Sequence, residues 1–84
     1  MTVDQINGMK HCIGYEISRV KKGKYEAYRN YYNNGEQKDD GWEELVSKGY
    51  AKQYVRFDQI IYCVTDEGKK LLESILDIKI TERD

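Results

Sequence analysis

The sequence predicts a single small domain of the α+β class, with three helices and a C-terminal β-hairpin. A chain of 84 residues is long enough for one hydrophobic core and too short for two. Three segments repeat apolar residues at helical spacing, and each follows a Thr or Asp that can cap a helix. Between the second and third of these segments, two β-rich runs at 51–57 and 59–64 flank a short turn.

The first helix is expected over residues 3–13. Thr2 and Gln5 fit a capping box, in which the Thr2 hydroxyl accepts from the Gln5 amide and the Gln5 side chain reaches back. Apolar residues then recur on one helical face, at Ile6, Met9 and Ile13. Gly14 follows directly and can adopt the left-handed conformation that ends helices.

The stretch up to the second helix is the most ambiguous. Tyr15 and Ile17 alternate with polar residues, which favours a strand. The Lys-Gly-Lys sequence at 22–24 is typical of a turn. Residues 25–32 contain four tyrosines without a clear period, so we expect an extended and partly paired segment that can add one strand. The Asn-Asn-Gly sequence at 33–35 ends it, because these residues tolerate positive φ.

The second helix is expected to begin at Asp40 as its N-cap, with Glu43 three residues later at N3. Its apolar face comprises Trp42, Leu45 and Val46. Lys48 complements the negative end of the helix dipole, and Gly49 closes the helix.

The third helix is expected to follow the hairpin, with Thr65 as its N-cap. Asp66 and Glu67 suit the positive end of its dipole. Its buried stripe is expected to comprise Leu71, Leu72, Ile75 and Leu76. Ile78 and Ile80 continue this apolar character beyond the core stripe. They suggest the hypothesis of a homodimer that packs through the terminal helix.

The charge of the chain is uneven. Its net charge of −1 excludes a globally cationic nucleic-acid binder. Residues 16–32 carry five Lys or Arg against two Glu, whereas residues 36–44 carry five Asp or Glu against one Lys. The chain is therefore a neutral body with one basic and one acidic segment, each suited to a partner of opposite charge.

The strongest binding candidate is a basic-aromatic segment in the first half of the chain. It comprises Lys21, Lys22, Lys24, Tyr25, Tyr28, Arg29, Tyr31 and Tyr32. Alternating cations and rings can hold phosphates and stack bases, or pair with an acidic protein. In the alternative interpretation the segment is a solvated loop whose tyrosines pack inward.

Two further candidates lie around the second helix and the hairpin. The acidic patch comprises Glu36, Asp39, Asp40, Glu43 and Glu44. It can imitate a phosphate backbone or face a basic protein surface, or it is only a helix start stabilised by the helix dipole. The hairpin tip comprises Arg56, Phe57 and Asp58. Exposure of the Phe57 ring at this turn would be the informative observation.

Two longer resemblances concern the second half and the whole chain. Residues 45–51 (LVSKGYA) and 62–68 (YCVTDEG) resemble the end of many winged-helix regulators, where a helix ends in Gly, a wing follows and a threonine-acidic-glycine turn opens the last helix. The resemblance implies a small winged-helix-like domain with the hairpin as its wing. The chain also resembles a group of small bacteriophage and prophage proteins, through the sequences KHCIG, YRNYY, WEELVSKG and YCVTDEG.

The resemblance to phage proteins implies a non-enzymatic viral accessory protein that occludes a macromolecular partner, first of all a host protein or protein–nucleic acid complex. Inhibitors of CRISPR and other host defences are one such class. Such a protein would act in the cytoplasm of an infected or lysogenic bacterium. The alternative is a small winged-helix DNA-binding regulator. That alternative is disfavoured because only one helix fits between Gly35 and Gly49, and its acidic first turn would repel phosphates.

No residue pattern for catalysis, a metal or a cofactor stands out, so we expect neither an enzyme nor a cofactor site. His11, Cys12 and Cys63 offer three zinc ligands at best, without the spacing of a closed site. Adjacent helix residues point about 100° apart, which separates His11 from Cys12 as a catalytic pair. The cysteines are expected to be buried thiols in a reducing compartment. No apolar run has the length of a bilayer span, so no membrane partner is expected.

Overall fold

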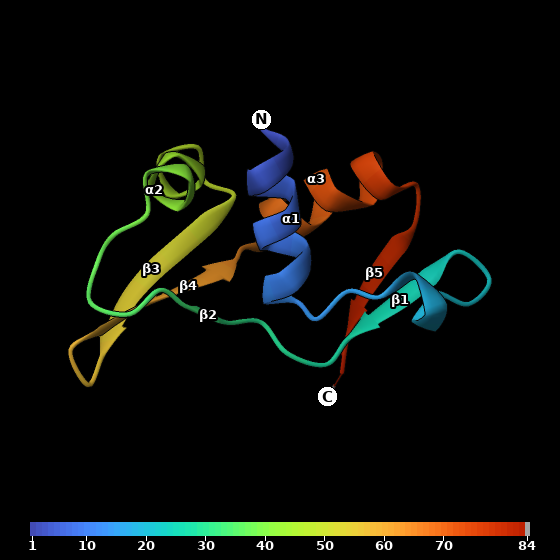
Figure 1. Ribbon diagram of the computed structural model, residues 1–84. Helices are drawn as coiled ribbons and strands as arrows, with labels where there is room; N and C mark the ends of the chain where they lie inside the picture. The colour runs from blue at the N-terminus through green and yellow to red at the C-terminus, as the bar shows by residue number, and fades with distance from the viewer. Residues whose placement is uncertain (84) are drawn as a thin grey trace.

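The computed structural model describes residues 1–83, which fold into three α-helices, one short 3-10 helix and five strands (Figure 1). The elements follow in the order α1 (Val3–Cys12), η1 (Ile17–Arg19), β1 (Lys24–Ala27), β2 (Tyr32–Asn33), α2 (Asp40–Ser47), β3 (Ala51–Arg56), β4 (Gln59–Val64), α3 (Asp66–Leu76) and β5 (Lys79–Glu82). The strands form two separate sheets.

The larger sheet is antiparallel and has the order β2-β4-β3, whereas the smaller sheet pairs β1 with β5 in parallel. Strand β4 is central, so Tyr62 pairs with Tyr32 on one side and with Gln53 on the other. In the smaller sheet, Tyr25 lies opposite Ile80. Figure 1 shows β1 and β5 at the end of the molecule away from the β3–β4 hairpin.

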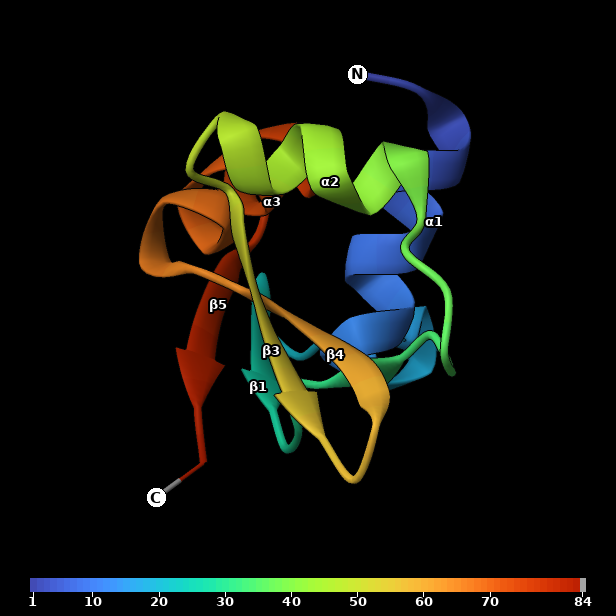
Figure 2. The same cartoon turned by 90° about the vertical axis from the view of Figure 1, so that its left-hand side faces the viewer.

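One face of β4 forms the base of the core. Its residues Ile60, Tyr62 and Val64 belong to one buried cluster with side chains from all three α-helices, namely Met9, Cys12, Trp42, Leu45 and Leu72. The rings of Trp42 and Tyr62 stack, with centroids 5.2 Å apart and an interplanar angle of 8°. Figure 2 shows the helices gathered above and behind the β3–β4 hairpin.

The winged-helix prediction is wrong, although the α+β class and the hairpin are found. In a winged helix the helices come first and the hairpin wing follows, whereas here strands precede α2 and a helix and a further strand follow the hairpin. The physical reason is that β4 has partners on both edges. Tyr32 and Asn33 pair with Tyr62 and Ile61, so strand β4 of the hairpin is built into the core sheet and does not project as a wing.

The chain end also differs from the sequence-based expectation. Helix α3 ends at Asp77, which adopts the left-handed conformation at φ 55°, and residues Lys79–Glu82 then return as strand β5. Ile80 is consequently buried against the body of its own chain. The proposed apolar extension of a terminal helix does not exist, and the homodimer hypothesis that depended on it loses its structural basis. Ile75, expected in the buried stripe, is 42% exposed.

Residues near Tyr15 were expected to form a strand, and this too is wrong. Ile17 begins the 3-10 helix η1 and is 80% exposed. The apolar and polar alternation has no neighbouring strand to pair with, and a strand without a partner leaves its backbone groups unsatisfied. The expectation of partly paired, extended chain further on is confirmed by β1 and β2.

The helix starts are set by local side-chain bonds. Thr2 and Gln5 form the expected capping box, and Thr65 caps α3 by accepting from the Gly68 amide at 3.1 Å. The cap of α2 is Asp39 and not Asp40, because Asp39 Oδ2 accepts from the Trp42 amide at 2.8 Å. Within residues 1–83, none of the helices has the length and apolar character needed to span a bilayer.

Candidate functional site

The tip of the β3–β4 hairpin has an unusual turn. Arg56 and Gln59 form the last strand pair, which leaves Phe57 and Asp58 as a two-residue loop. Both loop residues have positive φ, 52° for Phe57 and 61° for Asp58. Two successive residues in this region are typical of a type I′ turn, a position that normally holds Asn-Gly or Asp-Gly. A bulky aromatic residue in the left-handed region costs about 1–2 kcal/mol.

The Phe57 ring does not pack in the core, so no buried contact of the ring offsets this strain. Its side chain is 86% exposed, the highest value among the large apolar residues within 1–83. The only aromatic or cationic contact of this ring in the described chain is with the Arg56 guanidinium, 5.5 Å from its centroid. Backbone strain combined with an exposed aromatic ring is typical of a site that serves binding and not folding.

Strand β3 carries two further exposed apolar residues near this tip. Tyr54 is 43% exposed and Val55 is 64% exposed, and as consecutive residues of an edge strand they lie on opposite faces of the sheet. Arg56, Phe57 and Asp58 were expected at this tip from the sequence, whereas Tyr54 and Val55 were not. The sequence did contain an indication of these two residues, because an aromatic and a β-branched residue stand shortly before a turn without Gly. Their availability to a partner depends on β3 being an edge strand, which only the sheet order shows.

The acidic patch is partly engaged inside the protein. Asp39 caps α2, and Glu43 accepts hydrogen bonds from the Tyr62 hydroxyl at 2.5 Å and from Gln53 Nε2 at 2.7 Å. The bond from Tyr62 is the main cause that lowers the pKa of the Glu43 carboxyl. Glu44 accepts from Gln5 Nε2 at 3.0 Å, the main cause of its lowered pKa, and pairs with Lys48.

The five carboxylates of the acidic patch therefore do not form one free surface, and the patch is divided between the fold and the solvent. Glu36 and Asp40 are exposed and make no hydrogen bond or ion pair through their side chains with the described residues. Asp39 and Glu43 are half-buried and serve the fold. The role of Asp39 is local, because it accepts from the Trp42 amide, whereas the role of Glu43 depends on Gln53 and Tyr62 in the hairpin.

The basic-aromatic segment is divided between the core and the surface. Tyr25 is 1% exposed and donates to the carbonyl of Gly14 at 2.5 Å, so it belongs to the core and not to a binding surface. Tyr32 is half-buried, with its ring 5.5 Å from that of Trp42. The exposed members are Lys21, Lys22, Lys24, Tyr28 and Tyr31.

Arg29 connects this segment to α1. Its Nη2 donates to the His11 carbonyl at 2.7 Å, and its guanidinium lies 5.6 Å from the centre of the Tyr28 ring. Arg19 approaches the same ring at 4.8 Å. Two cations therefore lie close to the Tyr28 ring, which leaves less of it for stacking on a base than the sequence suggested.

The two cysteines that suggested chemistry are buried. Burial raises the pKa of the Cys12 thiol to about 12, and burial likewise raises the pKa of Cys63. Both cysteines are buried free thiols, as expected, and a neutral thiol is a poor nucleophile. His11 packs its ring edge against Tyr32 at 5.6 Å. Within residues 1–83 there is no group of three or more His, Cys, Asp or Glu side chains that could hold a metal ion.

Comparison with known proteins finds no matching family model, no matching curated protein and no matching solved structure. The resemblance to small phage proteins therefore stays a prediction from short motifs.

Proposed function

We propose that this chain is a non-enzymatic binding protein that attaches to another protein through the hairpin tip, with Phe57 as its anchor. The observation that carries the proposal is the combination of 86% exposure and positive φ at this one aromatic residue. The positive φ lowers the stability of the isolated chain, and burial of the exposed ring against a partner would contribute binding free energy.

The surroundings of Phe57 have the composition of a binding hot spot. Aromatic residues and Arg are enriched at the centre of protein interfaces, and the Arg56 guanidinium lies 5.5 Å from the centre of the Phe57 ring, with Tyr54 two residues earlier in β3. The open edge of β3 adds main-chain groups. Because the Thr65 amide donates to the Tyr50 carbonyl at 3.1 Å, the antiparallel alternation turns the backbone of Gln53 and Val55 away from β4. A partner strand can pair there.

The kind of partner follows from the resemblance to small phage proteins. A host protein whose surface is occluded, in the cytoplasm of an infected bacterium, is the partner that this resemblance favours. A component of a host defence system is one candidate of this kind. The net charge of the chain, −1, is close to zero, and this supports a protein surface over nucleic acid as the principal target.

The double substitution Phe57→Asn with Asp58→Gly tests the anchor. Asn-Gly is the preferred type I′ sequence, so the variant should be more stable by about 1 kcal/mol and yet lose binding. Capture from bacterial lysate, identification by mass spectrometry and calorimetry with the purified partner measure both effects. Affinity should fall at least about tenfold, as for a hot-spot residue.

Ile17→Asn is the matched control, because Ile17 is 80% exposed and lies in η1, far from the hairpin in sequence. It should leave the affinity for the captured protein unchanged. Equal affinity of the wild-type protein and the hairpin variant would refute Phe57 as the anchor.

A second candidate function is nucleic-acid binding through the exposed turn at Lys21, Lys22 and Lys24. None of these lysines forms an ion pair within the described residues 1–83. The helix geometry of a winged-helix reader is absent from the fold, so such binding would be to the phosphate backbone. A gel-shift titration at several salt concentrations separates the functions, since backbone binding weakens steeply with salt.

A further inference from the structure

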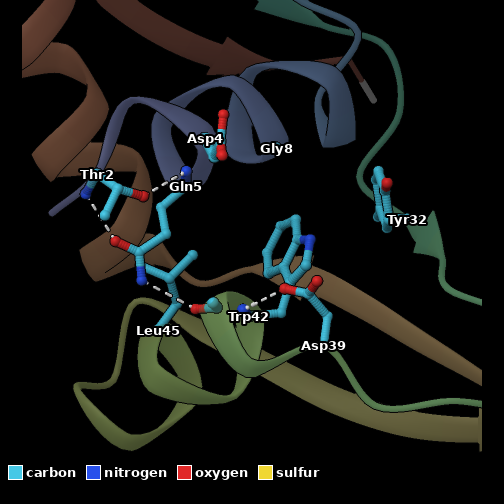
Figure 3. Close-up of a pocket in the computed structure, with 9 residues that line it drawn as sticks. Thr2, Asp4, Gln5, Gly8, Tyr32, Asp39, Trp42 and Leu45 are labelled. Carbon is cyan, nitrogen blue, oxygen red and sulfur yellow. Dashed lines mark hydrogen bonds between the residues drawn. The ribbon is translucent and has the colours of Figure 1, made fainter.

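The pocket between α1 and α2 is framed by hydrogen bonds that serve the fold (Figure 3). Gln5 Nε2 donates to the Gly41 carbonyl at 3.0 Å, and Asp39 Oδ2 accepts from the Trp42 amide at 2.8 Å. These bonds hold the two helix starts in place, which gives the pocket a structural role. Unpaired main-chain groups lie elsewhere, on the hairpin.

The outer edge of strand β3 carries these unpaired groups. The antiparallel alternation turns the N–H and C=O groups of Gln53 and Val55 away from β4, and they form no hydrogen bond with residues 1–83. The tip half of the hairpin extends away from the three α-helices in both views (Figure 1 and Figure 2). An open edge of this kind is a template for a further strand.

The side chains along this edge are apolar or cationic, and they are free to contact a second strand. Val55 is 64% exposed and Tyr54 is 43% exposed. Lys52 and Arg56 are exposed and form no ion pair within residues 1–83. Cations on an edge strand oppose pairing wherever they meet further cations, so they restrict which strand can be added.

Symmetry and charge limit how a second copy of β3 can pair with the first. A two-fold axis across the sheet makes the strands antiparallel, and it has to pass through Gln53, Tyr54 or Val55 for the outward backbone groups to meet. An axis at Tyr54 would place Lys52 opposite Arg56 of the second copy, and like charges directly opposite destabilise a sheet. An axis at Gln53 would press the tip of the second copy against the turn that joins α2 to β3.

The axis at Val55 gives complementary neighbours. The two Val55 side chains face each other, and Tyr54 of each copy lies opposite Arg56 of the other, where a guanidinium can contact the ring. Lys52 of each copy then lies nearest to the turn that carries Asp58 of the other. The exposed groups of this edge are therefore suitable partners for the same edge of a second copy, and the net charge of −1 on each chain adds little repulsion.

We propose that two copies of this chain pair through β3 about a two-fold axis at Val55. The inference goes beyond the proposed function and does not depend on it. The dimer would cover the same hairpin that is proposed to bind a host protein, so dimer formation and capture of that protein would compete. Because the contact is smaller than a standard interface, we expect a dissociation constant of about 10–100 μM.

The axis at Val55 permits a charge-pairing test. Val55→Lys places two ammonium groups opposite each other and Val55→Glu places two carboxylates, so the dissociation constant of each variant alone should rise about tenfold. An equimolar mixture should form a heterodimer with an affinity close to that of the wild-type dimer, because Lys then faces Glu. Sedimentation velocity at several concentrations measures the affinities, and native mass spectrometry identifies the heterodimer by its mass.

Ile17→Lys and Ile17→Glu are the matched controls, because Ile17 is 80% exposed and lies in η1, outside the hairpin. Both should dimerise as the wild-type protein does, alone and in the mixture. Val55 and Ile17 are both exposed, so all four variants should fold, and thermal melting followed by circular dichroism checks this.

A wild-type protein that stays monomeric at about 1 mM would overturn the proposal. Dimers of Val55→Lys as strong as those of the wild-type protein would overturn the axis at Val55, and so would a mixture of the two Val55 variants that stays monomeric. Loss of host-protein capture in the Phe57→Asn, Asp58→Gly variant is measured separately, so either proposal can fail without the other.

Discussion

The role of Glu43 is set by a tertiary hydrogen bond. In the sequence it is one of five carboxylates in an acidic segment, at the N3 position of the expected helix. In the structure the Tyr62 hydroxyl donates to it at 2.5 Å, and the same hydroxyl accepts from the Asp39 amide at 3.2 Å. Tyr62 thereby connects the centre of the sheet to the first turn of α2.

Tyr62→Phe should make the stability of the protein less sensitive to acid. The pKa of Glu43 is lowered from its ordinary value of 4.5 in the folded state, chiefly by the Tyr62 hydrogen bond. Its contribution to stability is therefore present above pH 4.5 and is lost as the pH falls through the folded-state pKa. Melting temperatures between about pH 6 and 3, with NMR titration of the Glu43 carboxyl, measure this loss.

In the Tyr62→Phe protein the pKa of Glu43 should move back towards its ordinary value, and the melting temperature should depend less on pH in the acid range. Tyr50→Phe is the control, because its hydroxyl makes no hydrogen bond to the described residues. An unchanged pKa of Glu43 in Tyr62→Phe would contradict the assignment.

At the scale of elements, hydrogen bonds hold the start of α3 against the end of α2. The Thr65 hydroxyl donates to the Gly49 carbonyl at 2.6 Å while it accepts from the Gly68 amide. The backbone of Gly68 approaches this turn so closely that a Cβ would lie 2.1 Å from the Tyr50 carbonyl oxygen and 2.7 Å from Val64 Cγ1. Glycine is required here by the space and not by φ.

Gly68→Ala should lower the free energy of unfolding by about 2–3 kcal/mol, because the main chain must move to admit the methyl group. Gly8→Ala is the matched control within α1. Its Cβ would make an ordinary contact with Trp42 at 3.4 Å, and the helix should gain about 0.5–1 kcal/mol. Urea denaturation of both variants measures the difference. Equal effects of the two substitutions would show that α3 can shift away from Tyr50.

At the scale of the whole molecule, the pairing of β1 with β5 joins the first third of the chain to its end. Tyr25 and Ile80 lie opposite each other in this sheet, and both are buried. Lys69 of α3, itself buried, forms an ion pair with Glu82 of β5. The last strand is therefore part of the core structure and not an appended tail.

Ile80→Ala should lower the free energy of unfolding by about 2–4 kcal/mol, because it leaves a cavity beside Tyr25. Ile75→Ala removes the same atoms from a side chain that is 42% exposed and should change stability by less than about 1 kcal/mol. Urea denaturation measures both values, and hydrogen exchange should show faster exchange of the β1 amides only in Ile80→Ala. A small effect at Ile80 would show that β5 is dispensable for the core.

The candidate sites could be predicted only as far as they are local. The tip was located correctly at Arg56, Phe57 and Asp58, because a turn between two β-rich runs is visible in the sequence. The free edge of β3 was not foreseen. It depends on β3 having β4 alone as its neighbour among the described strands, and no local pattern of residues shows this.

The sequence by itself determined the helix starts at Thr2 and Thr65 and the hairpin, since caps and short turns are set by bonds between residues within a few positions of each other. The tertiary structure alone decided that β2 joins β4, and that the last residues form β5 beside β1 and not the end of a helix. The physical reason is that an edge of a strand can accept many partners, and only the packing of the whole chain selects one.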